Sequence, residues 1–372
     1  MNLSGWLIVT ILGLGCILFF GHPQLPSITE EDSLNKDSWD KEAFNIPAIE
    51  ERDSEKITWL KKVGEVKDGF CVEEEYNYFI KITSLCVDDG NDFYVADSGQ
   101  YRIYKFNHRG KFLYSFGSRG QGQGEFIGSI WIAAGNDGKL YIIDDGNRRL
   151  IVFSVSGRFI KQFPIISVSR DTPCVNSNGD IYLLSSSEMK IIDVFSKHMK
   201  LKKSLLEMKY HLDFPYVSPP KKTFLRVKRP SIFNVKKLII ENDNLLIFFN
   251  NSHKTVICDN KNNILKTFKI NHPRFVKDYK ARIKNIIEKG GWLNSIGSIV
   301  ADSSGYLYFS YFNASLGIPE ILRYGKDGTF IDTLRAKNNT DPTYQLLSGC
   351  DKLGNFYSVE DSSKVIIYQI ED

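Results

Sequence analysis

The sequence predicts an all-β protein, a six-bladed β-propeller made of four-stranded antiparallel blades. Three observations support this fold class. Short apolar segments alternate with turns rich in Asp, Asn and Gly. A four-strand pattern recurs along the chain, and equivalent residues such as Tyr94 and Tyr141 lie 47 positions apart. Aromatic residues that favour strands are abundant, with 25 Phe and 18 Tyr against 4 Met, and the 42% hydrophobic content is that of a globular protein.

The first two units define the repeat. One is "LCVDDGNDFYVADSGQYRIYKFNHRGKFLYSFG", from Leu85 to Gly117, and the next is "IAAGNDGKLYIIDDGNRRLIVFSVSGRFIKQF", from Ile132 to Phe163. Four short strands separated by turns at a spacing of 40–50 residues are typical of a propeller blade. The equivalent pairs are Tyr94 and Tyr141, Asp97 and Asp144, Arg102 and Arg149, Phe106 and Phe153, Gly110 and Gly157, and Phe116 and Phe163.

Weaker copies of the pattern follow, at Cys174–Phe195, Ile239–Phe268, Val300–Leu334 and Gly349–Ile370. The last copy lacks a fourth strand. A candidate for that strand lies ahead of the first unit, in "ITWLKKVGE" from Ile57 to Glu65. An N-terminal strand that completes the last blade would close the ring and cover strand edges that would otherwise be exposed.

Several motif residues of these first units resemble the NHL repeat. The loop before the second unit matches the family's glycine-rich segment at Gly120, Gly122, Gly124, Glu125 and Phe126. The later part of the unit matches at Asp144, Asn147, Arg149 and Phe153. The match is specific over about Leu85–Phe163 and only architectural from Cys174 onward. The resemblance implies a six-bladed propeller, but no single activity, because such propellers serve as binding scaffolds, nucleic-acid binders and enzymes.

The glycine-rich stretch "GSRGQGQGEF", from Gly117 to Phe126, is expected to connect the outer strand of one blade to the inner strand of the next. A phosphate-binding loop would be followed by a helix, whereas the strand-like "IGSIWIAA" follows here. In a propeller this loop shares one face with the turns between second and third strands. We therefore predict a partner-binding face made of Arg119, Gln121, Gln123, Asp145, Arg148, Arg170, Asp171 and Tyr344.

Two insertions are expected to lengthen the repeat, at about 197–237 and 271–291. The first carries twelve Lys/Arg and two acidic residues from Lys197 to Lys237. It is interpreted either as a solvated basic insertion close to an anionic membrane or, as in RNA-binding propellers of the family, as a nucleic-acid site, which is not expected in an exported domain. The second has the pattern of a surface helix. Its apolar face would hold Phe275, Tyr279, Ile283 and Ile286, and Arg274, Lys277 and Lys284 would point outward.

The N-terminus differs from the rest of the chain, because residues 1–21 carry no charged side chain. This stretch predicts a membrane anchor or a signal peptide cleaved near Gly21. Residues 22–56 form an acidic polar spacer, and 57–372 form the propeller. The domain is expected to be extracytoplasmic, either periplasmic or extracellular and membrane-anchored, or secreted if the segment is cleaved.

No His or Cys pattern indicates a catalytic or zinc site. If the central channel held a metal such as calcium, its ligands would be Asp88, Glu241, Asp302 and Asp351, together with Asn176; the alternative is that these side chains brace turns. Cys86, Cys174 and Cys350 fall at small inner-strand positions and are expected to be free thiols, whereas Cys71 and Cys258 are undecided.

The sequence therefore predicts a monomeric, non-catalytic scaffold without a required cofactor, which binds a protein or glycan partner. The alternative is a metal-dependent hydrolase or lyase with calcium or zinc in the channel.

Overall fold

The computed structural model describes most of the chain from Lys56 onward. The described residues are 56–67, 78–165, 172–184, 190–207, 235–241, 243–249, 254–259, 261, 263–289, 296–313, 316–336 and 346–371. The predicted anchor and spacer therefore lie outside the described residues. Within the described part of the chain, no helix has the length and apolar character needed to cross a bilayer.

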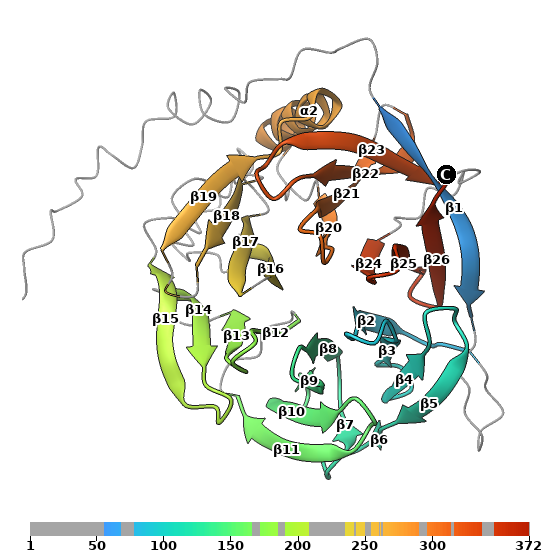
Figure 1. The fold of residues 1–372 in the computed structure, drawn as a ribbon, viewed down its shortest axis with the longest axis vertical. Helices are drawn as coiled ribbons and strands as arrows, with labels where there is room; N and C mark the ends of the chain where they lie inside the picture. The colour runs from blue at the N-terminus through green and yellow to red at the C-terminus, as the bar shows by residue number, and fades with distance from the viewer. Residues whose placement is uncertain are drawn as a thin grey trace, which may run out of the picture.

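The strands form antiparallel sheets arranged radially around a central axis, which is the β-propeller that the sequence predicts (Figure 1). Each sheet runs in chain order from an inner to an outer strand. The first two sheets contain β2 (Ile82–Val87), β3 (Phe93–Asp97), β4 (Arg102–Phe106) and β5 (Phe112–Phe116), and then β8 (Ile130–Gly135), β9 (Lys139–Asp144), β10 (Arg149–Ser154) and β11 (Phe159–Pro164). The next two contain β12 (Cys174–Val175), β13 (Ile181–Leu184), β14 (Lys190–Phe195) and β15 (Leu201–Glu207), and then β16 (Val235–Glu241), β17 (Asn244–Phe249), β18 (Lys254–Cys258) and β19 (Ile264–Lys269).

An eight-stranded sheet completes the ring. One half holds β20 (Ile296–Ala301), β21 (Leu307–Asn313), β22 (Ile318–Tyr324) and β23 (Phe330–Ala336). The other half holds β24 (Leu346–Cys350), β25 (Asn355–Glu360), β26 (Lys364–Ile370) and the N-terminal strand β1 (Ile57–Val66). A separate two-stranded ribbon is formed by β6 (Ser118–Arg119) and β7 (Glu125–Phe126).

Strand β1 confirms the predicted closure and adds a second junction. It pairs antiparallel with β26 from Leu60 to Val66, as the incomplete last repeat requires. Its first residues also pair parallel with β23, from Ile57 to Leu60. The change of partner falls at Leu60, and a register shift between Lys62 and Gly64 follows in the pairing with β26. One N-terminal strand thus joins two neighbouring units of the ring.

The core lies between neighbouring sheets, which explains the residue pattern of each strand. The second strands are buried on both faces; every residue of β3 is buried. The outer strands have one face toward solvent, and β11 alternates between half-buried and exposed residues. One core cluster shows the packing: Tyr94 and Ile103 from one sheet meet Ile132, Ile142 and Phe153 from the next. Burial between sheets therefore selects continuous apolar second strands and alternating outer strands.

The structure corrects the boundaries of the first predicted insertion. Leu201–Glu207 forms the outer strand β15, and Val235–Lys237 begins the inner strand β16, so both ends of the predicted 197–237 insertion belong to the ring. Its middle lies outside the described residues. The sequence pattern missed β15 because consecutive Lys residues conceal the alternation of an outer strand.

The second insertion contains the predicted helix, α2 (Pro273–Lys289), which packs on the outside of the ring (Figure 1). Phe275 and Tyr279 are buried against Tyr311 and neighbouring residues, as the helical pattern predicts. Arg274 does not point freely outward as predicted. It is half-buried, and its Nη1 lies 3.7 Å from Oε1 of Glu320, because the helix lies over this buried carboxylate.

Candidate binding face around the glycine-rich loop

The glycine-rich loop is a compact turn that carries the β6–β7 ribbon between the outer strand β5 and the inner strand β8. Gly117 has a φ of +101°, and an added Cβ would lie 2.5 Å from Cε2 of Phe126. At Gly120 an added Cβ would lie 2.0 Å from the carboxylate of Glu125, which accepts a hydrogen bond from the Gly122 amide at 2.6 Å. Close packing therefore requires a glycine at Gly117, which faces an aromatic ring, whereas at Gly120 an added Cβ would meet only the end of the flexible Glu125 side chain.

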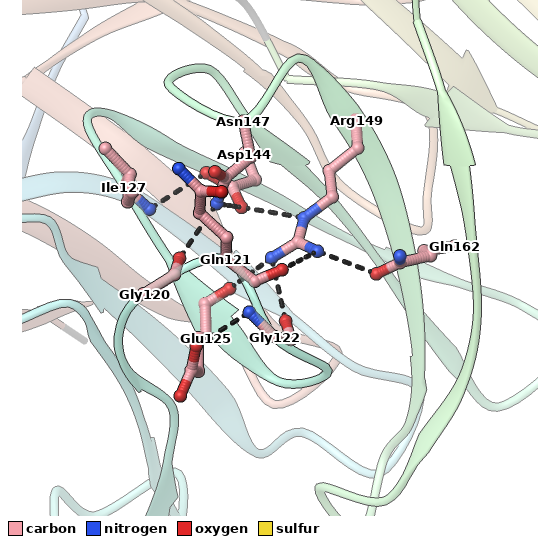
Figure 2. Close-up of polar contacts among 9 residues, drawn as sticks. All are labelled: Gly120, Gln121, Gly122, Glu125, Ile127, Asp144, Asn147, Arg149 and Gln162. Atoms are coloured by element: carbon pink, nitrogen blue, oxygen red, sulfur yellow. Dashed lines mark hydrogen bonds and ion pairs between the residues drawn. The ribbon is translucent and has the colours of Figure 1, made fainter.

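A buried arginine holds the loop from beneath (Figure 2). The guanidinium of Arg149, which is 6% exposed, donates to the carbonyl oxygens of Gln121, Gly122 and Glu125 at 2.8, 3.0 and 2.7 Å. It also donates to Oε1 of Gln162 at 2.8 Å. Five donors in a rigid planar fork suit this arrangement, because one side chain satisfies several loop carbonyls at once.

Asp144 anchors that arginine and links it to the loop. Its carboxylate is fully buried and accepts from Nε of Arg149 at 3.0 Å, from Nδ2 of Asn147 at 2.7 Å and from the amide of Ile127 at 3.0 Å. Asn147 also donates to the carbonyl of Gly120 at 3.0 Å. The Asp, Asn and Arg that match the repeat motif are thus parts of one network that fixes the loop backbone.

The turn between β9 and β10 is bound to the same loop. The amide of Gly146 donates to the carbonyl of Ile127 at 2.8 Å, and the amide of Asp145 donates to the carbonyl of Ser129 at 3.1 Å. Arg148 follows with a φ of +51°, a left-handed conformation that is uncommon for a residue with a Cβ. The loop and the turn therefore form one surface.

The structure brings together the predicted partner-binding residues that it describes. Arg119, Gln121, Gln123 and Arg148 are exposed on the loop and the turn, and Asp145 is half-buried beside them. Arg170, Asp171 and Tyr344 lie outside the described residues, so their placement stays a prediction.

Sequence reasoning missed one residue of this surface, Tyr101. The guanidinium of Arg119 lies over the ring of Tyr101, with Cζ 5.6 Å from the centroid. Tyr101 has a φ of +58° and occupies the position equivalent to Arg148. The period of 47 residues that aligned the other pairs would have identified it.

The candidate metal ligands are engaged in turns, as the alternative interpretation stated. Asp351 accepts from the amides of Leu353 and Asn355, from Nδ2 of Asn355 and from the hydroxyl of Tyr357. Asp88 and Asp302 brace their own turns in the same way, each also accepting from a tyrosine hydroxyl six residues later.

No set of three or more His, Cys, Asp or Glu side chains suited to a metal ion occurs in the described residues. The side chain of Glu241 lies outside them. The carboxylates of Asp88, Asp302 and Asp351 each belong to a separate turn, in three different four-stranded units of the ring.

The predicted free thiols are confirmed for Cys86, Cys174 and Cys350, and Cys258, which the sequence left undecided, is also a free thiol. Burial raises the pKa of the Cys258 thiol to about 11, with a further increase from the nearby Asp259. Cys174 donates to the carbonyl of Leu238 at 3.0 Å, so it connects two neighbouring inner strands. Cys71 lies outside the described residues.

Comparisons with known proteins agree with the fold. The family model described as "DUF5128: 6-bladed beta-propeller" matches residues 74–236, which is under half of the chain. The search of curated proteins gave no match. The NHL-repeat family is not shown by any of these comparisons, and that resemblance stays a prediction.

Among solved structures, a protein of Bacteroides fragilis described as a candidate exported protein superposes with a TM-score of 0.52 at 11% identity, covering 85% of this chain and 100% of that chain. A streptogramin B lyase gives a TM-score of 0.47 at 13% identity, with 81% and 82% coverage. Virginiamycin B lyase from Staphylococcus aureus gives 0.46 at 10% identity, with 81% and 83% coverage. At these identities the likeness concerns the fold alone, and of these three structures only the Bacteroides fragilis protein has a TM-score above 0.5.

Proposed function

We propose that the protein is a six-bladed β-propeller that acts as a non-catalytic scaffold and binds a protein or glycan partner through the glycine-rich loop and the β9–β10 turn. The four four-stranded sheets and the two halves of the eight-stranded sheet support a count of six blades. The observation that carries the binding role is the Arg149 network. It fixes the backbone of the loop from beneath, while Arg119, Gln121 and Gln123 extend into solvent above it.

A surface fixed in this way supports binding because little conformational entropy is lost when a partner docks. Stacking on Tyr101 orients Arg119. Within the described residues, neither Arg119 nor Arg148 forms a hydrogen bond or ion pair through its guanidinium. Guanidinium and amide groups are planar, and they recognise carboxylates and carbonyls of proteins or the oxygens of sugars by paired hydrogen bonds. The left-handed backbone of Arg148 is a further feature that is concentrated at binding sites.

We propose an extracytoplasmic location, membrane-anchored or secreted, for this scaffold. The uncharged residues 1–21 support it, as does the structural similarity to a candidate exported protein. The metal-dependent hydrolase or lyase is the alternative function, and the elemental analysis described in the Discussion distinguishes it from the scaffold.

The test uses a photo-crosslinking amino acid placed in the full chain at Gln121 or Gln123 and, as a control, at the exposed Lys326 in the turn between β22 and β23. Cells are irradiated, and the adducts are identified by mass spectrometry and, for sugars, by glycan staining. We expect a specific adduct at the loop positions that disappears when Arg119→Ala and Arg148→Ala are combined. Equal adducts at Lys326, or adducts unaffected by the double substitution, would refute the binding face.

A further inference from the structure

A second surface, on the outer wall of the ring, is strongly basic. We define it as the basic wall, residues 155–165 around β11 and 195–204 around β15. These segments carry six Lys/Arg and no Asp or Glu. Figure 1 shows β11 and β15 as outermost strands that follow one another around the ring. The cations are Arg158, Lys161, Lys197, Lys200, Lys202 and Lys203.

A direct contact joins the two sheets of the basic wall. Nζ of Lys161 in β11 donates to the carbonyl of Lys197 at 2.5 Å and lies 5.0 Å from the ring centroid of Phe163. The pKa of Lys161 is lowered by burial and by the like charges of Lys139 and Lys197, although the nearby Asp137 acts in the opposite direction. Ammonium groups from two neighbouring units are therefore held close enough to repel one another.

Few acids offset this charge. Asp137 pairs with Lys139, and Asp180 pairs with Lys202 at 2.7 Å. Elsewhere on the wall, no acidic side chain of the described chain pairs with Arg158, Lys197, Lys200 or Lys203. The wall thus retains uncompensated positive charge, although like charges gathered in this way reduce the stability of the fold.

Apolar side chains are exposed among these cations. Ile160 in β11 is 37% exposed, and Leu201 in β15 is 53% exposed between Lys200 and Lys202. Lysines interleaved with exposed aliphatic residues have the composition of surfaces that lie at a membrane interface, where the ammonium groups meet lipid phosphates and the aliphatic groups enter the headgroup region. A nucleic-acid surface would instead offer exposed aromatic rings for stacking, whereas Phe163 is half-buried beneath Lys161.

We propose that the basic wall lies against the surface of a lipid bilayer that contains anionic headgroups. An outer wall suits an extended charged surface better than a small ligand, which binds in concave sites. Each Lys or Arg near an anionic membrane increases partitioning about fivefold. This second contact would act together with the predicted N-terminal anchor, because tethering makes even weak additional contacts effective. It would also orient the ring at the membrane, and it does not depend on the proposed partner-binding face.

The full chain is reconstituted into vesicles of phosphatidylcholine alone or of phosphatidylcholine with phosphatidylglycerol, and hydrogen exchange is measured along the chain. We expect peptides from β11 and β15 to be protected only in the anionic vesicles, and the protection to be lost at high salt. The test variant combines Lys197→Glu, Lys200→Glu and Lys203→Glu. In anionic vesicles, hydrogen exchange of the β11 and β15 peptides should be at least tenfold less protected in this variant than in the unmodified protein.

The matched control combines Lys266→Glu, Lys269→Glu and Lys326→Glu, which changes the net charge equally at other exposed positions. It should keep the protection of β11 and β15. Circular dichroism establishes that both variants fold. Protection that is equal in neutral and anionic vesicles, or equal loss in both variants, overturns the proposal. The proposal is also overturned if the test variant keeps its membrane protection and instead loses affinity for an RNA oligonucleotide.

Discussion

Replacement of Arg149 by alanine tests the reasoning about the glycine-rich loop most directly. The substitution removes five hydrogen bonds: one to the buried Asp144, three to loop carbonyls and one to Gln162. It leaves the carboxylate of Asp144, which is fully buried, with only Asn147 and the Ile127 amide as donors.

The magnitude follows from that burial. Removing one partner of a buried ion pair costs about 3–5 kcal/mol, because the remaining charge keeps its desolvation penalty without its counter-charge. At about 2 °C per kcal/mol for a large domain, the thermal midpoint should fall by roughly 6–10 °C. Arg149→Lys should recover only part of this loss, because an ammonium cannot reach the loop carbonyls and Asp144 together.

The assay is thermal and urea unfolding of the full chain, with hydrogen exchange of residues 117–127 as a local readout. Arg148→Ala is the matched control, since the same residue type is removed one position earlier from an exposed side chain; we expect a change within about 0.5 kcal/mol. If Arg149→Ala destabilises the protein no more than Arg148→Ala, or leaves loop exchange unchanged, the network does not hold the loop and the argument fails.

Three further predictions concern closure, titration and metal content. Leu60→Ala, at a 2% exposed position of β1, should lower the free energy of unfolding by about 2–5 kcal/mol, whereas the exposed Lys61→Ala in the same strand should have little effect; equal urea midpoints would contradict a closing role for β1. The pKa of Cys258 is raised from 9.0 to about 11, because the folded protein favours the protonated thiol; this stabilising contribution is complete below about pH 9 and is lost as the pH rises to 11. Between pH 8 and 11, the free energy of unfolding should therefore fall less steeply with pH in Cys258→Ala than in the unmodified protein. Elemental analysis of the dialysed protein should find less than one equivalent of calcium or zinc, because Asp302 and Asp351 already accept hydrogen bonds within their turns; a retained equivalent would favour the hydrolase or lyase.

The repeat could be predicted from the sequence because each strand is a local pattern. Tyr94 and Tyr141 lie on second strands that are buried on both faces, and such strands must be apolar wherever they occur in the ring. Strand β15 was missed because an outer strand has one face in solvent and tolerates lysines such as Lys202 and Lys203. The closing strand β1 was predicted because the last repeat lacks a fourth strand, but its parallel pairing with β23 was not predicted.

The sequence by itself determined the propeller class, the repeat, the closing strand and the helix α2, since these depend on periodicity and on turn residues within a few positions of each other. Only the tertiary structure showed that Arg149 holds the loop carbonyls, that Arg119 stacks on Tyr101, and that Lys161 meets Lys197 across two sheets. These contacts join residues 18 to 36 positions apart or lie between different units. Their geometry depends on how neighbouring sheets pack around the axis, which a one-dimensional pattern does not specify.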